Sequence, residues 1–285
     1  MAPILEVKNL NKSFGDFFLN EVSFTLDRGY IMGFIGPNGA GKSTTIKLIM
    51  NLLKKDSGEI RIFGMDHLKK EREIKERIGF VYDENCFYEE LTVSEMKRVV
   101  SAFYKNWDDS QFCKYLKEFN LPAKKKIKQL SKGMKMKFAL AIALSHQAEL
   151  LIMDEPTSGL DPVVRNELLD ILAWIIQDEN KGILFSTHIT SDLEKIADYI
   201  TLIDKGRIIL SRTKDELLDN YGIVKGGRDV LTSGLEKNVI GIRESKFGFE
   251  ALVDDRRKAD KIFKGQILIE KPSLEEIMLY YTRGK

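Results

Sequence analysis

Nine residues from Gly36 to Thr44, GPNGAGKST, contain three glycines, one lysine and two hydroxyl side chains. They match the pattern G-x-x-x-x-G-K-[ST], with an apolar strand-like run before them and an amphipathic helix-like segment after them. Glycines let successive backbone N–H groups converge on phosphate oxygens, and a helix that begins here adds its free N-terminal donors. The stretch therefore predicts a polyphosphate ligand. Lys42 is expected at the β- and γ-phosphates, Ser43 on Mg²⁺ and Thr44 on a further phosphate oxygen. The expected ligand contacts in this loop are Gly36, Pro37, Asn38, Gly39, Ala40, Gly41, Lys42, Ser43 and Thr44.

Two adjacent carboxylates indicate which phosphate chemistry follows. In LLIMDEP, Asp154 ends an apolar run and is placed to hold the Mg²⁺ shell, while Glu155 can orient and deprotonate a water that attacks the γ-phosphate. His188 follows another apolar run, GILFST, and the carboxyl ends of parallel strands share one edge of a sheet. His188 is therefore expected to contact the γ-phosphate. A GTPase would carry an N-K-x-D guanine reader, which is absent from the sequence, so these residues predict hydrolysis of another nucleoside triphosphate.

Five motifs in order resemble the ATP-binding subunit of an ABC transporter. They are GPNGAGKST, LSKGM at Leu130–Met134, LLIMDEP, SGLD at Ser158–Asp161 and the STH that ends at His188. The wording of SKGM and FSTHITSDLEKIAD is similar to nucleotide-binding subunits of bacterial drug, antibiotic and lantibiotic exporters. The resemblance implies an ATPase with ATP and Mg²⁺ as cofactors. It also implies a separate transmembrane permease as partner, a drug, antibiotic, peptide or lipid-like substrate for export, and a place on the cytoplasmic face of the cell membrane.

The signature motif implies a second ATPase subunit. Ser131 precedes a helix-like segment as a natural N-cap, so its hydroxyl and the N–H of Gly133 form another anion site. In the family this site closes on the ATP of a partner in a head-to-tail dimer, made of two identical or two related subunits. Asp161 before Pro162 is a typical N-cap and first helical residue, and the family adds a role across the dimer interface. Phe14, in KSFG, stands where the family stacks an aromatic ring on adenine.

Asp83 is a departure from the family. IGFVYDEN corresponds to the Q-loop, and Asp83 stands where the family has glutamine. A carboxylate can ligate Mg²⁺ directly or through water, but it lacks the donor of an amide. Asp83 is therefore either a metal ligand or a residue of a surface loop.

The expected fold class is α/β, namely a P-loop NTPase core with a parallel central sheet, N-terminal antiparallel strands, a helical insertion and a small C-terminal α/β appendage. Near-continuous apolar runs in YIMGFIG, ELLIMDE and GILFST predict the central parallel strands. The cassette is expected over residues 1–222, with the insertion over about 84–147, and the appendage over 223–285, with YGIVKGG as the boundary. The appendage either packs on its own cassette or meets a counterpart in the second subunit.

Composition limits the alternatives. The net charge is +2, so no nucleic-acid partner is expected, and the two cysteines lack metal-ligand spacing. No apolar run reaches the roughly 18–20 residues that span a bilayer. A soluble ABC protein that acts on ribosomes or nucleic acid is the alternative, but such proteins usually carry two cassettes or a long coiled coil. A P-loop module without turnover is a further alternative, against which Glu155 argues.

Overall fold

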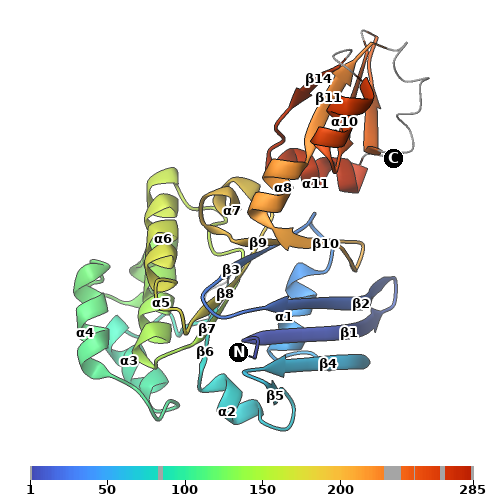
Figure 1. Cartoon of the computed structure of the whole chain (residues 1–285). Helices are drawn as coiled ribbons and strands as arrows, with labels where there is room; N and C mark the ends of the chain where they lie inside the picture. The colour runs from blue at the N-terminus through green and yellow to red at the C-terminus, as the bar shows by residue number, and fades with distance from the viewer. Residues whose placement is uncertain (1, 83–85, 228–238, 247, 264–266, 284–285) are drawn as a thin grey trace.

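The computed structural model describes residues 2–82, 86–227, 239–246, 248–263 and 267–283, and Figure 1 shows how its elements are arranged. A six-stranded sheet in the order β10-β9-β3-β8-β7-β6 forms the centre. Its strands are β3 (Ile31–Ile35), β6 (Ile78–Val81), β7 (Leu150–Asp154), β8 (Gly182–Thr187), β9 (Tyr199–Asp204) and β10 (Arg207–Thr213). All neighbours are parallel except β10, which runs antiparallel to β9. Every residue of β3, β7 and β8 is buried, which confirms the sheet that the apolar runs predict.

A second, antiparallel sheet covers one side of this centre. It has the order β2-β1-β4-β5, from β1 (Leu5–Phe14), β2 (Phe17–Leu26), β4 (Ser57–Ile62) and β5 (Met65–Asp66). One apolar core joins residues of this sheet, of α1 (Lys42–Ile49) and of the central strands. The core thereby fixes α1, and with it the phosphate loop, between the two sheets.

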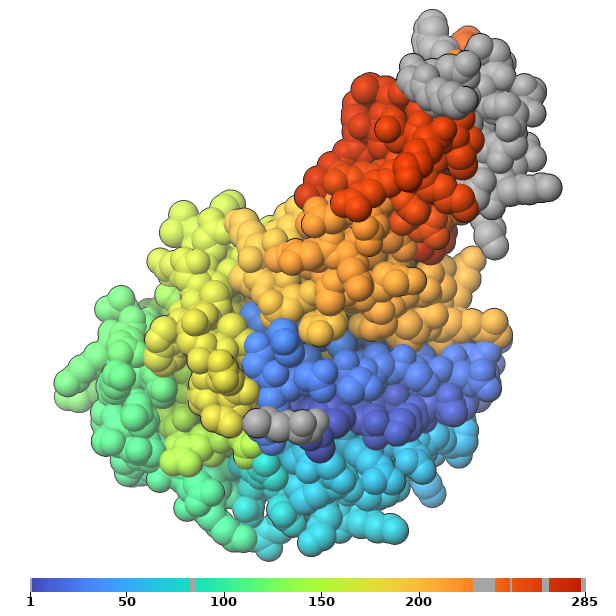
Figure 2. All heavy atoms as spheres, viewed as in Figure 1, coloured from blue at the N-terminus to red at the C-terminus, as the bar shows by residue number. Residues whose placement is uncertain are grey.

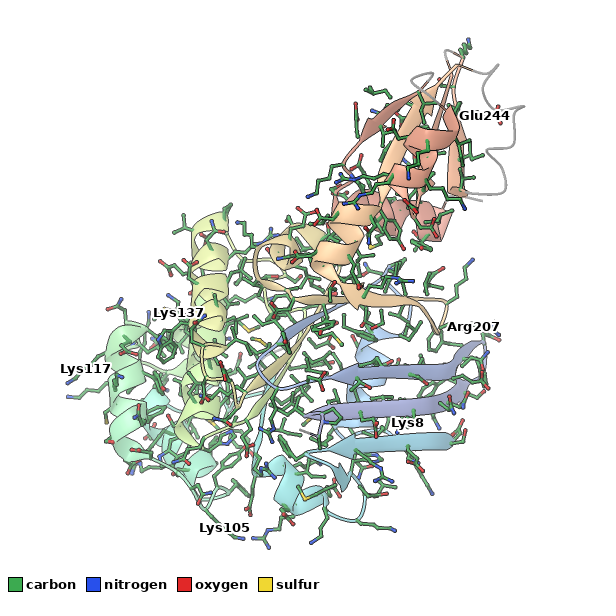
Figure 3. The ribbon with its side chains drawn as sticks, in the orientation of Figure 1. Lys8, Lys105, Lys117, Lys137, Arg207 and Glu244 are labelled. Carbon is green, nitrogen blue, oxygen red and sulfur yellow. The ribbon has the colours of Figure 1, made fainter. Side chains whose placement is uncertain are left out.

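Helices cover the other side of the central sheet. They are α3 (Val93–Ser101), α4 (Asp109–Glu118), the 3₁₀ turn η1 (Ile127–Gln129), α5 (Lys132–Ser145), α6 (Pro162–Ile175), α7 (Thr190–Ile196) and α8 (Lys214–Asn220). The short helix α2 (Glu71–Lys75) instead packs through Ile74 into the apolar core on the side of the antiparallel sheet. A capping box is present at Thr92 and Glu95, because each side chain accepts a hydrogen bond from the backbone N–H of the other residue. Charged side chains such as Lys105 and Lys117 point away from this layer (Figure 3).

The C-terminal elements form an antiparallel sheet of their own, in the order β12-β13-β11-β14. The strands are β11 (Gly222–Gly226), β12 (Val239–Glu244), β13 (Phe249–Val253) and β14 (Leu268–Glu270), with helices α10 (Arg256–Phe263) and α11 (Leu274–Arg283). The strands and helices expected from the sequence are thus present. Most of YGIVKGG, the expected boundary, is β11, an inner strand in which Ile223 and Val224 are buried. Figure 2 shows this sheet and its helices extending from the α8 side of the molecule.

The C-terminal sheet is fastened to the rest of the chain through α11. The backbone N–H of Leu274 donates to Glu194 Oε1 on α7 at 2.7 Å, and the hydroxyls of Tyr221 and Tyr281 lie 2.9 Å apart. Leu274 and Ile277 are buried in the same apolar core as the central sheet. This packing on the chain's own cassette is the first of the two expected arrangements. In the described part of the chain, no helix has the length and apolar character needed to cross a membrane.

Candidate functional site

The phosphate loop leaves the carboxyl end of β3 and enters α1 at Lys42. A Cβ on Gly36 would lie 2.2 Å from the carbonyl oxygen of Ile203, and Gly41 has φ +114°, so both positions require glycine. Gly41 is the N-cap of α1 and offers no side chain to the first turn. The N-terminal N–H groups of α1 are therefore available to an anion, as the sequence predicts.

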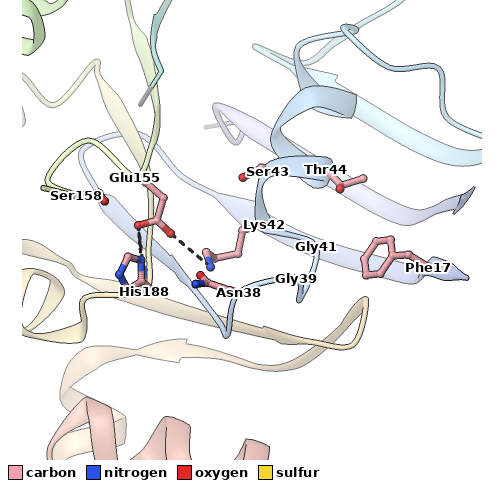
Figure 4. Close-up of a pocket in the computed structure, with 10 residues that line it drawn as sticks. All are labelled: Phe17, Asn38, Gly39, Gly41, Lys42, Ser43, Thr44, Glu155, Ser158 and His188. Carbon is pink, nitrogen blue, oxygen red and sulfur yellow. Dashed lines mark hydrogen bonds and ion pairs between the residues drawn. The ribbon is translucent and has the colours of Figure 1, made fainter. Parts of the chain in front are cut away.

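Lys42 lies under this loop and faces the two catalytic candidates (Figure 4). Its ammonium is buried and donates to the carbonyl oxygens of Gly36 at 2.8 Å and Pro37 at 3.3 Å. It also lies 3.4 Å from Glu155 Oε1. The other oxygen of Glu155 lies 2.8 Å from Nδ1 of His188 and 3.3 Å from the backbone nitrogen of His188. The folded chain thus brings together three residues that the sequence singles out from three distant segments.

The backbone at Glu155 is unusual. Its φ is +50°, a left-handed conformation that non-glycine residues seldom adopt and that costs about 1–3 kcal/mol. Two backbone hydrogen bonds hold it, from the N–H of Glu155 to Ser186 at 2.9 Å and from the N–H of Ser158 to Glu155 at 3.1 Å. The turn directs the Glu155 carboxylate toward the phosphate loop instead of along the strand.

Asp154 lies one residue earlier, at the end of β7, and is only 3% exposed. Burial raises the pKa of its carboxyl, and a hydrogen bond with Ser43 offsets part of that shift. Its Oδ1 has no hydrogen-bond partner among the described residues. An orphaned carboxylate oxygen beside a serine hydroxyl suits Mg²⁺, which prefers one or two protein oxygens completed by phosphate and water. Ser43 and Asp154 therefore fit the expected ion.

A cavity of about 580 Å³ opens over these residues. Of the predicted ligand contacts, Asn38, Gly39 and the run from Gly41 to Thr44 line it, together with Glu155 and His188. Phe17 and Ser158 also line it, and the sequence analysis missed both. Ser158 lies in the SGLD motif, three residues after Glu155, and this short spacing could have predicted that Ser158 lies at the site.

Phe14 is not among the residues that line this cavity. It ends β1, is 40% exposed and has the Lys12 ammonium 5.2 Å from its ring centre. Phe17, its cross-strand neighbour at the start of β2, is the ring that faces the phosphate loop (Figure 4). The adenine role of Phe14 stays a prediction, and Phe17 joins it as a candidate.

The signature residues lie away from the cavity lining. Ser131 caps α5 by accepting from the N–H of Met134 at 3.2 Å, and Asp161 caps α6 by accepting from Val163 and Val164, each at 3.1 Å. A Cβ on Gly133 would lie 2.3 Å from Val164 Cγ1, so the start of α5 and the start of α6 are in close contact. Asp83 lies outside the described residues, so its metal role stays a prediction.

A parallel sheet whose carboxyl edge carries a phosphate loop, an Asp-Glu pair and a histidine defines a P-loop ATPase. The family described as "ABC transporter" matches residues 19–158. A second description, "AAA domain, putative AbiEii toxin, Type IV TA system", matches residues 126–191. With the relatives below, these matches show that the chain belongs to the family of ABC transporter ATP-binding proteins. It is an enzyme that binds and hydrolyses ATP to power a separate permease.

Several relatives are transport subunits by name. The bacitracin transport ATP-binding protein BcrA of Bacillus licheniformis is 34% identical over 214 residues, which cover 73% of this chain and 69% of BcrA. The lantibiotic transport ATP-binding protein SrtF of Streptococcus pyogenes is 36% identical over 215 residues, 74% of this chain and 92% of SrtF. The ABC transporter ATP-binding protein YtrB of Bacillus subtilis is 27% identical over 290 residues and 99% of both chains, so this similarity includes the C-terminal sheet.

A solved structure of an ATP-binding subunit of an ABC transporter has the same fold. It superposes with a TM-score of 0.69 at 32% identity and covers 75% of this chain and 91% of that chain. The α/β core with its antiparallel second sheet is therefore the fold of this family.

Proposed function

We propose that this chain drives export of a drug, antibiotic, peptide or lipid-like substrate, as one of two ATPase subunits that close head to tail on ATP and Mg²⁺. The main support is that Glu155 lies next to both Lys42 and His188, and that all three residues line the phosphate cavity. The names of the bacitracin and lantibiotic relatives support the class of substrate. Binding to a permease would hold the chain at the cytoplasmic face of the membrane.

In this proposal each residue has one task. Lys42, whose ammonium lies 3.4 Å from Glu155 Oε1, would bind the phosphate oxygens of ATP. Glu155 would accept a proton from the attacking water, and His188 would contact the γ-phosphate and orient the Glu155 carboxylate through Nδ1. Ser43 and Asp154 would hold Mg²⁺, which neutralises charge on the β- and γ-phosphates.

The separation of the signature residues from the cavity supports a dimer. Ser131 is exposed and Gly133 packs on α6, and neither lines the cavity over Lys42. An anion site at the start of α5 would therefore serve the ATP of a second subunit, with Asp161 at the same interface. We assign residues 1–222 to the cassette, about 84–147 to its helical insertion, and 223–285 to an accessory unit. A role on ribosomes or nucleic acid is not favoured by relatives that are named as transport subunits.

The test uses Glu155→Gln, which keeps the shape of the side chain and removes the base. We expect ATP hydrolysis to fall by at least about a hundredfold, while MgATP still binds and size-exclusion chromatography shows an ATP-dependent dimer. Glu179→Gln changes an exposed carboxylate at the other end of the chain's central sheet and is the matched control. Wild-type turnover in Glu155→Gln would remove Glu155 from this role. A permanent monomer with bound MgATP would contradict the dimer.

The permease is tested separately. The tagged full-length chain, purified from gently solubilised membranes of its own host, should retain a polytopic membrane protein. Recovery of ribosomes instead would favour the alternative function.

A further inference from the structure

We propose that Arg165 is a positioning residue for ATP hydrolysis. It holds the first turn of α7, and so fixes the segment that carries His188, through contacts with Asp192 and Ser191. This inference rests on the proposed roles of Glu155 and His188 and adds a residue that lies outside the five motifs.

The contacts of Arg165 converge on one turn of α7. Its Nε lies 2.5 Å from Asp192 Oδ1, and its Nη2 donates to Ser191 Oγ at 2.9 Å. Asp192 is 1% exposed, and its second oxygen, Oδ2, has no hydrogen-bond partner within the described ranges. Arg165 is therefore the cation that compensates a carboxylate in the interior.

The start of α7 depends on this outside support. Its N-cap residue is Ile189, whose side chain cannot accept a hydrogen bond from the first turn. Thr187 Oγ1 accepts from the N–H of Ile189 at 3.0 Å. His188, which lies between these two residues in the sequence, contacts Glu155 through its ring and its backbone nitrogen. A shift of the first turn of α7 would therefore move His188 relative to the Glu155 carboxylate.

Arg165 lies at the N-terminal end of α6, which is held in place by its cap and by packing. It lies in the first turn of α6, which Asp161 caps and Pro162 begins. The neighbouring residue Val164 packs directly on Gly133 of α5. Because α6 is fixed at this end, the ion pair couples the position of α6 to the first turn of α7.

A purely stabilising role is a poor explanation of this pair. Replacing a buried ion pair with apolar side chains of similar size is often neutral or stabilising, and a buried carboxylate oxygen without a partner is costly. A second, exposed link between the same helices, from Lys195 Nζ to Asn166 Oδ1 at 2.7 Å, joins α7 to α6 without touching its first turn. Removing this second link tests whether any loss of contact between α6 and α7 lowers activity, and it is therefore the matched control.

The experiment replaces both partners, Arg165→Leu with Asp192→Leu, so that no charge is left buried and the fold is kept. In the full-length chain, we expect kcat to fall by about tenfold or more, with ATP affinity within about threefold of wild type because the phosphate loop is untouched. Arg165→Lys, which keeps the charge but loses the two-pronged geometry, should give an intermediate kcat. Asn166→Ala should leave kcat unchanged.

A cycle with His188 separates positioning from stability. If Arg165 acts through His188, the paired leucine change should cause no further loss of kcat in a His188→Ala background. Additive losses, or wild-type kcat in the paired variant, would overturn the positioning role. The His188→Ala variant alone reports on the proposed function, because retained turnover there would remove His188 from catalysis whatever the paired variant does.

Discussion

Asp154→Asn should make the protein more stable in the absence of nucleotide and should remove most of the stabilisation that Mg²⁺ adds to the ATP complex. The carboxylate is 3% exposed, one of its oxygens has no partner in the described part of the chain, and the adjacent Glu155 adds like charge. An unsatisfied buried group costs about 1–3 kcal/mol. The amide keeps the shape and removes the charge. With an unfolding entropy of about 2.1 cal/mol/K per residue, a gain of about 2 kcal/mol raises Tm by about 3 °C for 285 residues.

This gain should be offset when nucleotide and metal are present. Saturation at a hundred times Kd stabilises a protein by about 2.7 kcal/mol, so wild type should gain about 4–5 °C with MgATP. The variant has lost one expected Mg²⁺ ligand, so most of the Mg²⁺-dependent part of this shift should disappear. The assay is thermal unfolding in EDTA, in ATP with EDTA and in MgATP, with Glu179→Gln, which changes an exposed carboxylate, as the control. A lower Tm without nucleotide, or a full Mg²⁺-dependent shift in the variant, would refute this account of Asp154.

Three further outcomes are expected. Lys42→Ala should weaken MgATP binding by at least about tenfold, since a charge-assisted phosphate contact is lost; titration with a fluorescent ATP analogue measures it, and unchanged affinity would contradict the role. Phe17→Ala should weaken ATP binding more than Phe14→Ala does, because only Phe17 lines the cavity in the described structure; inorganic triphosphate, which has no base to stack, should bind both variants alike. Burial lowers the pKa of His146 from 6.5 to about 4. Because the folded-state pKa lies below the unfolded one, stability is complete above pH 6.5 and falls by up to about 3 kcal/mol as the pH drops toward 4. His146→Phe, which keeps a ring on Tyr104, should remove that loss when urea unfolding is compared at pH 7.5 and pH 5, and an unchanged pH dependence would count against it.

The sequence predicts the fold and the centre of the site because local rules agree there. Fully buried parallel strands are apolar throughout, and their carboxyl ends must share one edge. The sequence alone therefore predicts that Asp154 and His188 lie near Lys42. The motif order indicates the family. The alternating pattern of ILEVKNL and EVSFTL predicts the antiparallel strands, and the capping pair Thr92 and Glu95 predicts the helical insertion.

Sequence reasoning failed where tertiary contacts decide. Phe14 and Phe17 occupy equivalent ends of one hairpin, and only the packing of β2 against the phosphate loop selects which ring faces the cavity. Gly222 follows the C-cap of α8, as its place after the helical segment predicts, but the sequence does not show that it also begins β11, where a Cβ would lie 2.9 Å from Arg256 and Ile269. The contact of Arg165 with Asp192 spans two helices and leaves no local pattern.

The order of strands in the central sheet also sets when the active site can form during synthesis. In the described structure β3 pairs with β8 and β9, so Ile31 cannot pair with Ile183 until about 150 further residues have been synthesised. At about 5–20 residues per second, the ribosome needs roughly 8–30 s to supply them. The antiparallel β1, β2 and β4 can pair long before that. A nascent chain would therefore carry a finished outer sheet and an unpaired apolar β3, a substrate for chaperones, until the strand that precedes His188 leaves the exit tunnel.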